Sequence, residues 1–177
     1  MSTLFGSIPS RYRLLIPAAC ALMIAACAQK PQPEPVAKPA PPPKPVPPPM
    51  LVIRDMHPAA PEKHGIVAAH IDFINGTQST LEYVMFKTTA YTGDGKLVRA
   101  KKTGRENAWL RVAGPFAPGE SSGDKRWEKV WQNSKLSCFR IDGAELIDVN
   151  GVVEYFEADR IELMPELAAK EACDGNS

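Results

Sequence analysis

The stretch IDFINGTQSTLEYVMFKTTAYTGDGKLV, residues 71–98, indicates the fold class because its apolar and polar residues alternate along the chain. Alternation with a period of two is typical of β-strands, whose successive side chains point to opposite faces of a sheet. The pattern predicts one strand over residues 66–74 and a longer one over residues 81–91, with Asn75-Gly76 as the break between them. Both faces of the longer strand carry large apolar side chains, so we expect it to be central in its sheet and covered on both sides.

Turn-forming pairs divide the following residues into more short strands. Asp94-Gly95 predicts a tight turn, and Gly114-Pro115 and Pro118-Gly119 bracket a loop. Further strands are expected from residue 96, over 127–131, over 136–141 with a bulge at Gly143, and on both sides of an Asn150-Gly151 hairpin. About seven short strands separated by turns are typical of a two-sheet sandwich. We therefore predict an all-β, Ig-like antiparallel β-sandwich over residues 51–164, followed by a short helical or disordered tail over residues 165–177.

The composition shows a boundary near residue 50 and no strong electrostatic field. Of the 18 prolines in the 177-residue chain, 11 lie between Pro31 and Pro49. Lysines and arginines number 21 against 20 aspartates and glutamates, so nucleic acid is not an expected partner. The 127 residues from Leu51 onward are enough for a single hydrophobic core.

The first 26 residues resemble the signal peptide of a bacterial lipoprotein. Two arginines precede an apolar segment that ends at residue 28, and its 15 residues are fewer than the roughly 20 that span a bilayer. Ile24-Ala25-Ala26-Cys27 matches the lipobox of that family at all four positions: an aliphatic residue, two small residues and cysteine. The competing match, Pro17-Ala18-Ala19-Cys20, fails at its first residue. The other interpretation is an ordinary cleaved secretion signal that contains two cysteines.

The resemblance implies that Cys27 is acylated and becomes the N-terminus of the mature chain. One acyl chain holds a protein only marginally, and the family adds further chains to the same cysteine. By the family's sorting habit, Ala28 favours the outer membrane, with the domain facing the periplasm. Residues 27–50 then form a disordered, proline-rich tether, and the 23 residues after Cys27 could reach roughly 70 Å at ~3.1 Å each.

The domain resembles a small Ig-like module of bacterial envelope proteins, akin to the FxLYD-type domains. The resemblance covers residues 71–151, which end in GPFAPGESSGDKRWEKVWQNSKLSCFRIDGAELIDVNG. The matching positions are Asn75, Tyr83-Val84, Gly95, Gly114-Pro115, Pro118-Gly119-Glu120, Trp127, Val130-Trp131, Asn133, Cys138, Ile141 and Asn150-Gly151. Asp148 departs from the pattern, because the family tends to place an aromatic residue there. The resemblance implies the fold and brings no catalytic residues.

Two cysteines remain once Cys27 is acylated and Cys20 is removed with the signal. Cys138 and Cys173 would meet in an oxidising periplasm, which favours a disulfide joining the tail to the sandwich. The alternative is that Cys138 is a buried small apolar residue.

No motif indicates catalysis or a bound cofactor. His57, His64 and His70 are seven and six residues apart, without the tight spacing of metal ligands, so we expect surface or hydrogen-bonded histidines and no metal. Nucleophile-elbow and phosphate-loop patterns do not occur. An acidic run around the last strand is expected to be a solvated edge; its members are Glu154, Glu157, Asp159 and Glu162. We predict that the protein is not an enzyme.

The aromatic residues are the candidate binding residues. Trp127 and Trp131 are four apart and share a face of their strand, where core packing is the expected role. The alternative is an exposed binding patch beside Tyr83 or Tyr91. We therefore expect a lipid-anchored protein that binds an envelope protein through an edge strand or loops. A glycan-binding module that tethers the outer membrane to peptidoglycan is the alternative function.

Overall fold

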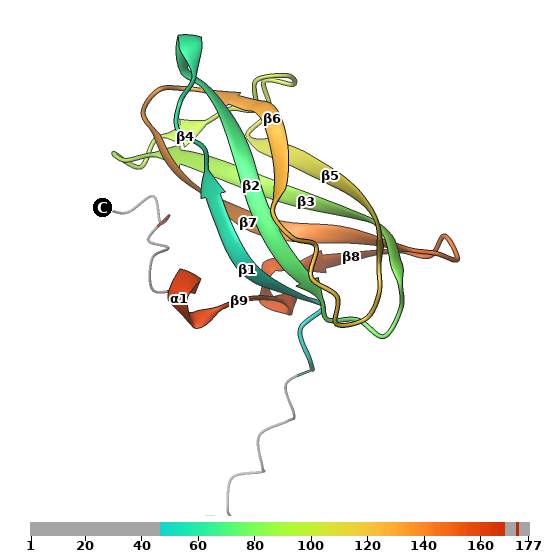
Figure 1. Cartoon of the computed structure of the whole chain (residues 1–177). Coiled ribbons are helices and arrows are strands. Elements are labelled where there is room, and N and C mark those ends of the chain that lie inside the picture. The colour runs from blue at the N-terminus through green and yellow to red at the C-terminus, as the bar shows by residue number, and fades with distance from the viewer. Residues whose placement is uncertain (1–46, 169–172, 174–177) are drawn as a thin grey trace, which may run out of the picture. The chain divides into compact units, whose positions relative to one another are not determined.

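The computed structural model describes residues 47–168 and Cys173. Within these residues the chain forms two packed β-sheets with very little helix (Figure 1). The prediction of an all-β sandwich is therefore confirmed. The predictions for the signal peptide, for Cys27, for the tether up to residue 46 and for most of the tail lie outside the described residues.

The first sheet has the strand order β6-β2-β1-β9. Its members are β1 (Leu51–Pro58), β2 (Ile66–Asn75), β6 (Lys125–Gln132) and β9 (Ile161–Leu163). Strand β2 pairs antiparallel with β1 and β6, whereas β9 runs parallel to β1. The sandwich is thus mixed at this edge, where the sequence predicted only antiparallel pairs.

The second sheet is built around β3 (Leu81–Thr92). One edge of β3 pairs with β7 (Leu136–Asp148), and the other pairs with β5 (Asn107–Phe116) and β4 (Leu97–Val98). Strand β8 (Val153–Glu157) continues the sheet beyond β7. The predicted central position of β3 is therefore confirmed.

Three short helices complete the described chain. The 3-10 turn η1 (Lys63–Gly65) lies between β1 and β2, and η2 (Ala158–Arg160) carries the chain from β8 to β9. The helix α1 (Pro165–Ala168) follows β9 and agrees with the helical turn predicted after Pro165.

The core lies between the two sheets, and most of its residues alternate along their strands. Phe73 of β2 packs edge-on against Phe86 of β3 and Phe116 of β5, with ring centroids 5.3 and 5.0 Å apart. Val84, Phe86 and Ala90 of β3 have no exposed surface. These contacts join strands from both sheets into a single core.

The outer face of β3 is only half covered, so the prediction that both faces are buried is wrong. Tyr83, Met85 and Lys87 are partly exposed on that face. The strands of the described residues form two sheets, and none of them forms a third sheet over this face.

Irregular strands explain the elements that the sequence pattern does not reveal. Ile53 and Met56 of β1 are both buried although they are three residues apart, because the β1–β2 register shifts at Arg54. In β5, the pair Gly114-Pro115, with a cis peptide bond, belongs to the strand rather than to a loop. The bulge predicted near Gly143 is present, since the β3–β7 register shifts there.

Candidate functional site

The structure separates the three aromatic residues proposed for binding. Trp131 has no exposed surface and packs on Phe139 with ring centroids 5.1 Å apart. It is a core residue, and we remove it from the candidates. Tyr83 lies on the outer face of the second sheet, where the Arg111 guanidinium stands 3.9 Å from its ring centroid. Trp127 is half-buried at the margin of the core.

Trp127 lines a cavity of about 370 Å³ between β5 and β6, one edge strand from each sheet. At one end of the cavity the backbone N–H of Lys101 donates to the Val130 carbonyl at 2.8 Å. At the other end the Trp127 indole Nε1–H donates to the Arg111 carbonyl at 2.6 Å. The cavity lies between residues 107–110 of β5, 127–130 of β6 and the connection from 100 to 105. We call it the β5–β6 seam.

A bulge in β6 accounts for the opening between the two strands. Lys129 has a φ of 55°, in the left-handed region that non-glycine residues rarely adopt. The β2–β6 register shifts between Val67 and Ala69, opposite this residue. A bulge bends its strand and increases the local twist. Strand β6 therefore contacts Lys101 and Arg111 through its residues Val130 and Trp127, and it diverges from β5 between these two contacts.

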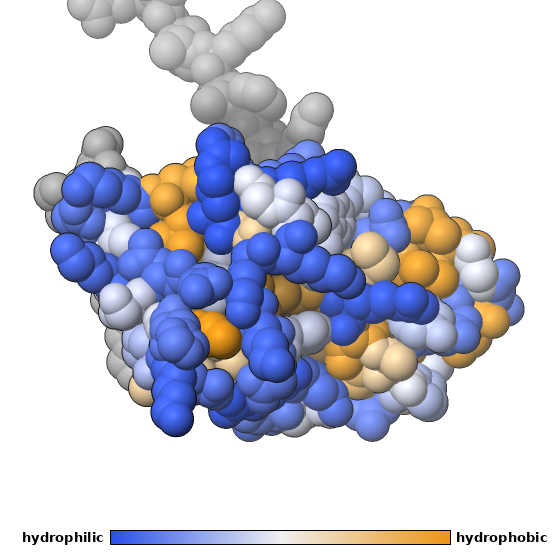
Figure 2. All heavy atoms as spheres, turned by 90° about the horizontal axis from the view of Figure 1, so that it is seen from above, coloured by the Kyte–Doolittle hydropathy of each residue, from blue (hydrophilic) through white to orange (hydrophobic). Residues whose placement is uncertain are grey.

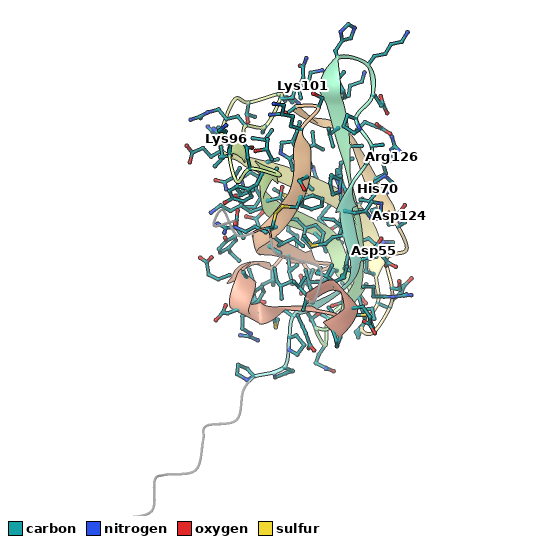
Figure 3. The ribbon with its side chains drawn as sticks, turned by 90° about the vertical axis from the view of Figure 1, so that its left-hand side faces the viewer. Asp55, His70, Lys96, Lys101, Asp124 and Arg126 are labelled. Atoms are coloured by element: carbon teal, nitrogen blue, oxygen red, sulfur yellow. A yellow bond between two sulfur atoms is a disulfide. The ribbon has the colours of Figure 1, made fainter. Side chains whose placement is uncertain are left out.

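The seam combines an apolar interior with a cationic rim. Leu110 is buried and Val130 is half-buried on its inner side, while Lys102, Arg105 and Lys129 are exposed around it. Seen from the end of the domain where Lys96 and Lys101 lie, hydrophobic surface shows between hydrophilic side chains (Figures 2 and 3).

Glu128, the acidic residue among the described residues that line the seam, is already paired. Arg126 Nε donates to Glu128 Oε1 at 2.6 Å, and this bond lowers the pKa of Glu128 and raises that of Arg126. Glu62 also contacts Arg126, at 3.2 Å. The rim therefore presents net positive charge to a ligand.

The backbone of β5 faces the seam with unpaired groups. The Ala108 carbonyl accepts a bond from Thr88 Oγ1, so it points towards β3, whereas the Arg111 carbonyl points towards β6. Since the polar groups of alternate residues in a strand point to opposite edges, the N–H and C=O of Trp109 also point away from β3. In the part of the chain that the structure describes, no backbone partner reaches them.

A second aromatic pair lies on the outer face of the second sheet. Trp109 and Tyr155 are 44% and 42% exposed, with ring centroids 6.4 Å apart. A Cβ at Gly143 would lie 2.3 Å from the Tyr155 hydroxyl, so the tyrosine ring crosses the strand at a position that only glycine permits. In the sequence, Trp109 alternates with the apolar residues Ala108 and Leu110, and this pattern places it on the opposite face of the strand.

The histidines on β1 and β2 are held by carboxylates. His57 and His70 are opposite each other, with parallel rings 4.8 Å apart. His57 Nδ1 is 3.0 Å from Asp55 Oδ2. His70 Nδ1 is 3.0 Å from Asp124 Oδ2, and Figure 3 labels both of these residues. Among the described residues, no three His, Cys, Asp or Glu side chains are placed to hold a metal ion.

The two cysteines left open by the sequence form a disulfide. Cys138 of β7 and Cys173 are joined, with their Cα atoms 5.8 Å apart. The bond attaches Cys173, which follows α1 in the chain, to the sandwich. Cys138 is therefore not a free cysteine.

The residue that departs from the FxLYD-type pattern stabilises a hairpin. Asp148 Oδ1 accepts bonds from the backbone N–H groups of Asn150 and Val152 at 2.8 and 2.9 Å. These bonds lower the pKa of Asp148. The carboxylate thus fixes the predicted Asn150-Gly151 turn, and the acidic residues of β8 after it are exposed, as expected for an edge strand.

Comparisons with protein-family models, with curated proteins and with solved structures find no match to this chain. Among the described residues, none of the helices has the length and apolar character needed to cross a membrane.

Proposed function

We propose that this protein is a non-catalytic outer-membrane lipoprotein that binds an extended segment of another envelope protein. Its parts would be an acylated Cys27, a proline-rich spacer and a periplasmic sandwich akin to the FxLYD-type modules. The lipobox Ile24-Ala25-Ala26-Cys27 and the proline content of residues 31–49 support the first two parts. Binding would occur by strand addition, in which a partner segment pairs with a free sheet edge.

The observation that carries the binding proposal is the unpaired edge of β5 beside an apolar cavity. Edge strands that expose unpaired backbone groups are sites for pairing with another chain unless they are covered. The outward N–H and C=O of Trp109 supply the main-chain bonds, and the seam supplies a pocket of about 370 Å³ for a side chain. Both features occur at the same place, as strand addition requires.

The position of the chain's first described residues suits a tethered module. The chain reaches β1 at one end of the domain, whereas Lys96 and Lys101 lie towards the other (Figures 1 and 3). The connection from residue 100 to residue 105 borders the seam. The seam therefore does not adjoin the point at which a tether would join the domain.

The anchor is tested by matched cysteine variants in the native host. Cys27→Ser should leave the membrane fraction and lose the acyl mass at the mature N-terminus, whereas Cys20→Ser should behave as wild type. If both variants remain in the membrane fraction with unchanged mass, the lipoprotein assignment is wrong.

Strand addition is tested by photo-cross-linking in cells. A photoreactive amino acid at Lys102, on the seam, should yield a discrete adduct that the same group at Glu162 of β9 does not yield. Addition of a peptide from the adduct should then protect the Trp109 amide from hydrogen exchange in the purified protein. Identical products from both positions, or an unprotected Trp109 amide, would contradict the proposal.

A glycan-binding module is the second candidate, and one observation favours it. Trp109 and Tyr155 form an exposed aromatic pair, a surface on which sugar rings can pack. Peptidoglycan fragments should then shift the tryptophan emission to the blue, and Trp109→Ala should abolish the shift. An unchanged spectrum would leave protein binding as the function.

A further inference from the structure

We infer that the β5–β6 seam recognises an acidic, extended peptide segment that inserts an apolar side chain between the two sheets. The inference rests on the strand addition proposed above and adds the chemistry of the partner. It follows from the size of the cavity, from the direction of the free backbone groups and from the charges on the rim.

The size of the seam limits the kind of ligand. A volume of about 370 Å³ is at the lower end of the usual range for ligand pockets. It has room for one or two side chains, and an α-helix with its side chains is ~10–12 Å across. An extended segment fits this shape, because it presents one side chain at a time to a given face.

The interior of the seam selects an apolar side chain. Leu110, Val130 and the inner edge of Trp127 lie at the margin of the core, with Phe86 in edge contact with the Trp127 ring at 6.3 Å. A residue inserted here would extend the core between the sheets. A charged residue would lose its hydration without a partner at this depth.

The outward direction of the Trp109 backbone groups places alternate residues of a paired peptide segment on the rim of the seam. A strand paired with Trp109 puts alternate side chains towards the seam and the others towards solvent. The outward positions would lie beside Lys102, Arg105 and Lys129, which line the mouth of the cavity.

The rim charges select acidic residues at those outward positions. Within residues 47–168, no carboxylate lies within ion-pair distance of Lys102, Arg105 or Lys129. Glu128, the acidic residue of the seam, is held by Arg126 at 2.6 Å. Three unpaired cations around an apolar slot are complementary to a segment in which acidic and apolar residues alternate.

Two occupants from the chain itself fit less well. The proline-rich segment carries 11 prolines between residues 31 and 49, and prolines cannot donate the main-chain bonds of a strand. Strand β8 of a second copy has Glu154 and Glu157, but its pairing with β5 would be head-to-tail and would build rings or open chains of many molecules. A separate acidic partner is therefore the occupant that we propose.

Synthetic peptides of about eight residues, within the usual length of a strand, provide the test. Three peptides alternate valine with glutamate, with glutamine or with lysine, and each is titrated into the full chain carrying Cys27→Ser. The readouts are the NMR signals of the Trp109 amide and the Trp127 indole N–H, together with calorimetric affinity. We expect the glutamate peptide to bind most tightly and the lysine peptide most weakly.

Charge-reversal variants locate the selectivity. Lys102→Glu combined with Lys129→Glu should weaken binding of the glutamate peptide by about fivefold or more, since two exposed ion pairs are lost and charge reversal adds repulsion. The control, Lys135→Glu, changes an exposed lysine outside the seam and should leave the affinity unchanged. Raising the salt concentration should reduce the difference between the peptides.

The outcomes separate this inference from the proposed function. Equal affinity for all three peptides, with shifts at Trp109, would overturn acidic selectivity while strand addition stands. Peptides that leave both signals unmoved would overturn strand addition itself. Self-association of the chain that is abolished by Lys102→Glu would assign the seam to a second copy and overturn the separate partner.

Discussion

The buried amide of Asn75 should be the largest single polar contribution to the stability of this domain. Its side chain has no exposed surface and lies at the end of β2, in the first sheet. Nδ2 donates to the Ser79 carbonyl at 2.8 Å and to the Phe116 carbonyl at 3.0 Å. Oδ1 accepts from the Thr77 N–H at 2.9 Å and from Thr77 Oγ1 at 2.7 Å. The amide therefore joins the β2–β3 turn to β5 of the second sheet.

The cost of Asn75→Ala follows from these four bonds. A typical internal hydrogen bond contributes about 1 kcal/mol, and a buried group left without a partner costs ~1–3 kcal/mol. We expect a loss of about 4 kcal/mol in the free energy of unfolding, a large part of the ~5–15 kcal/mol typical of a domain. With a urea slope of ~1.5–2 kcal/mol/M, the midpoint should fall by about 2–3 M.

Urea denaturation followed by tryptophan fluorescence measures this loss, with two variants as controls. Thr77→Val removes only the bonds of the threonine hydroxyl at the half-exposed turn and should cost about 1 kcal/mol. Asn75→Asp keeps the acceptor but turns an oxygen towards the Ser79 and Phe116 carbonyls, so it should cost at least as much as the alanine change. A loss below about 1 kcal/mol in Asn75→Ala, or equal losses in Asn75→Ala and Thr77→Val, would show that the buried amide does not stabilise the domain in this way.

Three further predictions concern the disulfide, a turn carboxylate and the bulge glycine. The variant Cys173→Ser removes the Cys138–Cys173 bond, which spans 35 residues of sequence. The chain-entropy relation predicts that the free energy of unfolding then falls by about 4 kcal/mol. A loss below about 1 kcal/mol, measured by calorimetry, would contradict this prediction. The pKa of Asp94 is lowered from 3.8 to about 2, chiefly by the hydrogen bond from Lys96. Its contribution to stability is therefore present above about pH 4 and lost as the pH falls towards about 2, and acid titration of Asp94→Asn should lack this part of the pH dependence. Gly143→Ala should lower the free energy of unfolding by about 1–3 kcal/mol, because the added methyl would lie 2.3 Å from the Tyr155 hydroxyl and 2.7 Å from the Phe156 carbonyl oxygen. An unchanged thermal unfolding would show that the backbone moves to accommodate the methyl group.

Regular alternation was sufficient to predict the strands whose side chains obey it. Residues 66–74 and 81–91 are strands in the structure, and the turns at Asp94-Gly95 and Asn150-Gly151 lie where the sequence places them. Strands β1 and β5 were missed because a register shift and the pair Gly114-Pro115 interrupt their periodicity. Hydrogen bonds to a neighbouring strand hold an irregular segment in the sheet despite a break in its alternation. The sequence of one strand does not show which strand will pair with it.

The aromatic residues show the same limit at the candidate site. Trp127 and Trp131 share one face of β6, as their spacing predicts, but their depth differs because one lies at the sandwich margin and the other inside it. Trp109, which the sequence does not favour over the other two, is the most exposed tryptophan and belongs to the free edge of β5. Distance from the sandwich edge is a property of strand order, and local sequence does not encode strand order.

The all-β class and the change of composition near residue 50 can be recognised from the sequence, because alternation and proline content are local properties. Three features are visible only in the folded chain: the strands that lie at sheet edges, the contact between Cys138 and Cys173, and the β5–β6 seam beside the bulge at Lys129. These features arise where residues distant in sequence are brought together, and their positions follow from the packing of the two sheets. The periodicity of a strand depends on residues that are adjacent in sequence, whereas a cavity or an unpaired sheet edge exists only between segments that folding brings together.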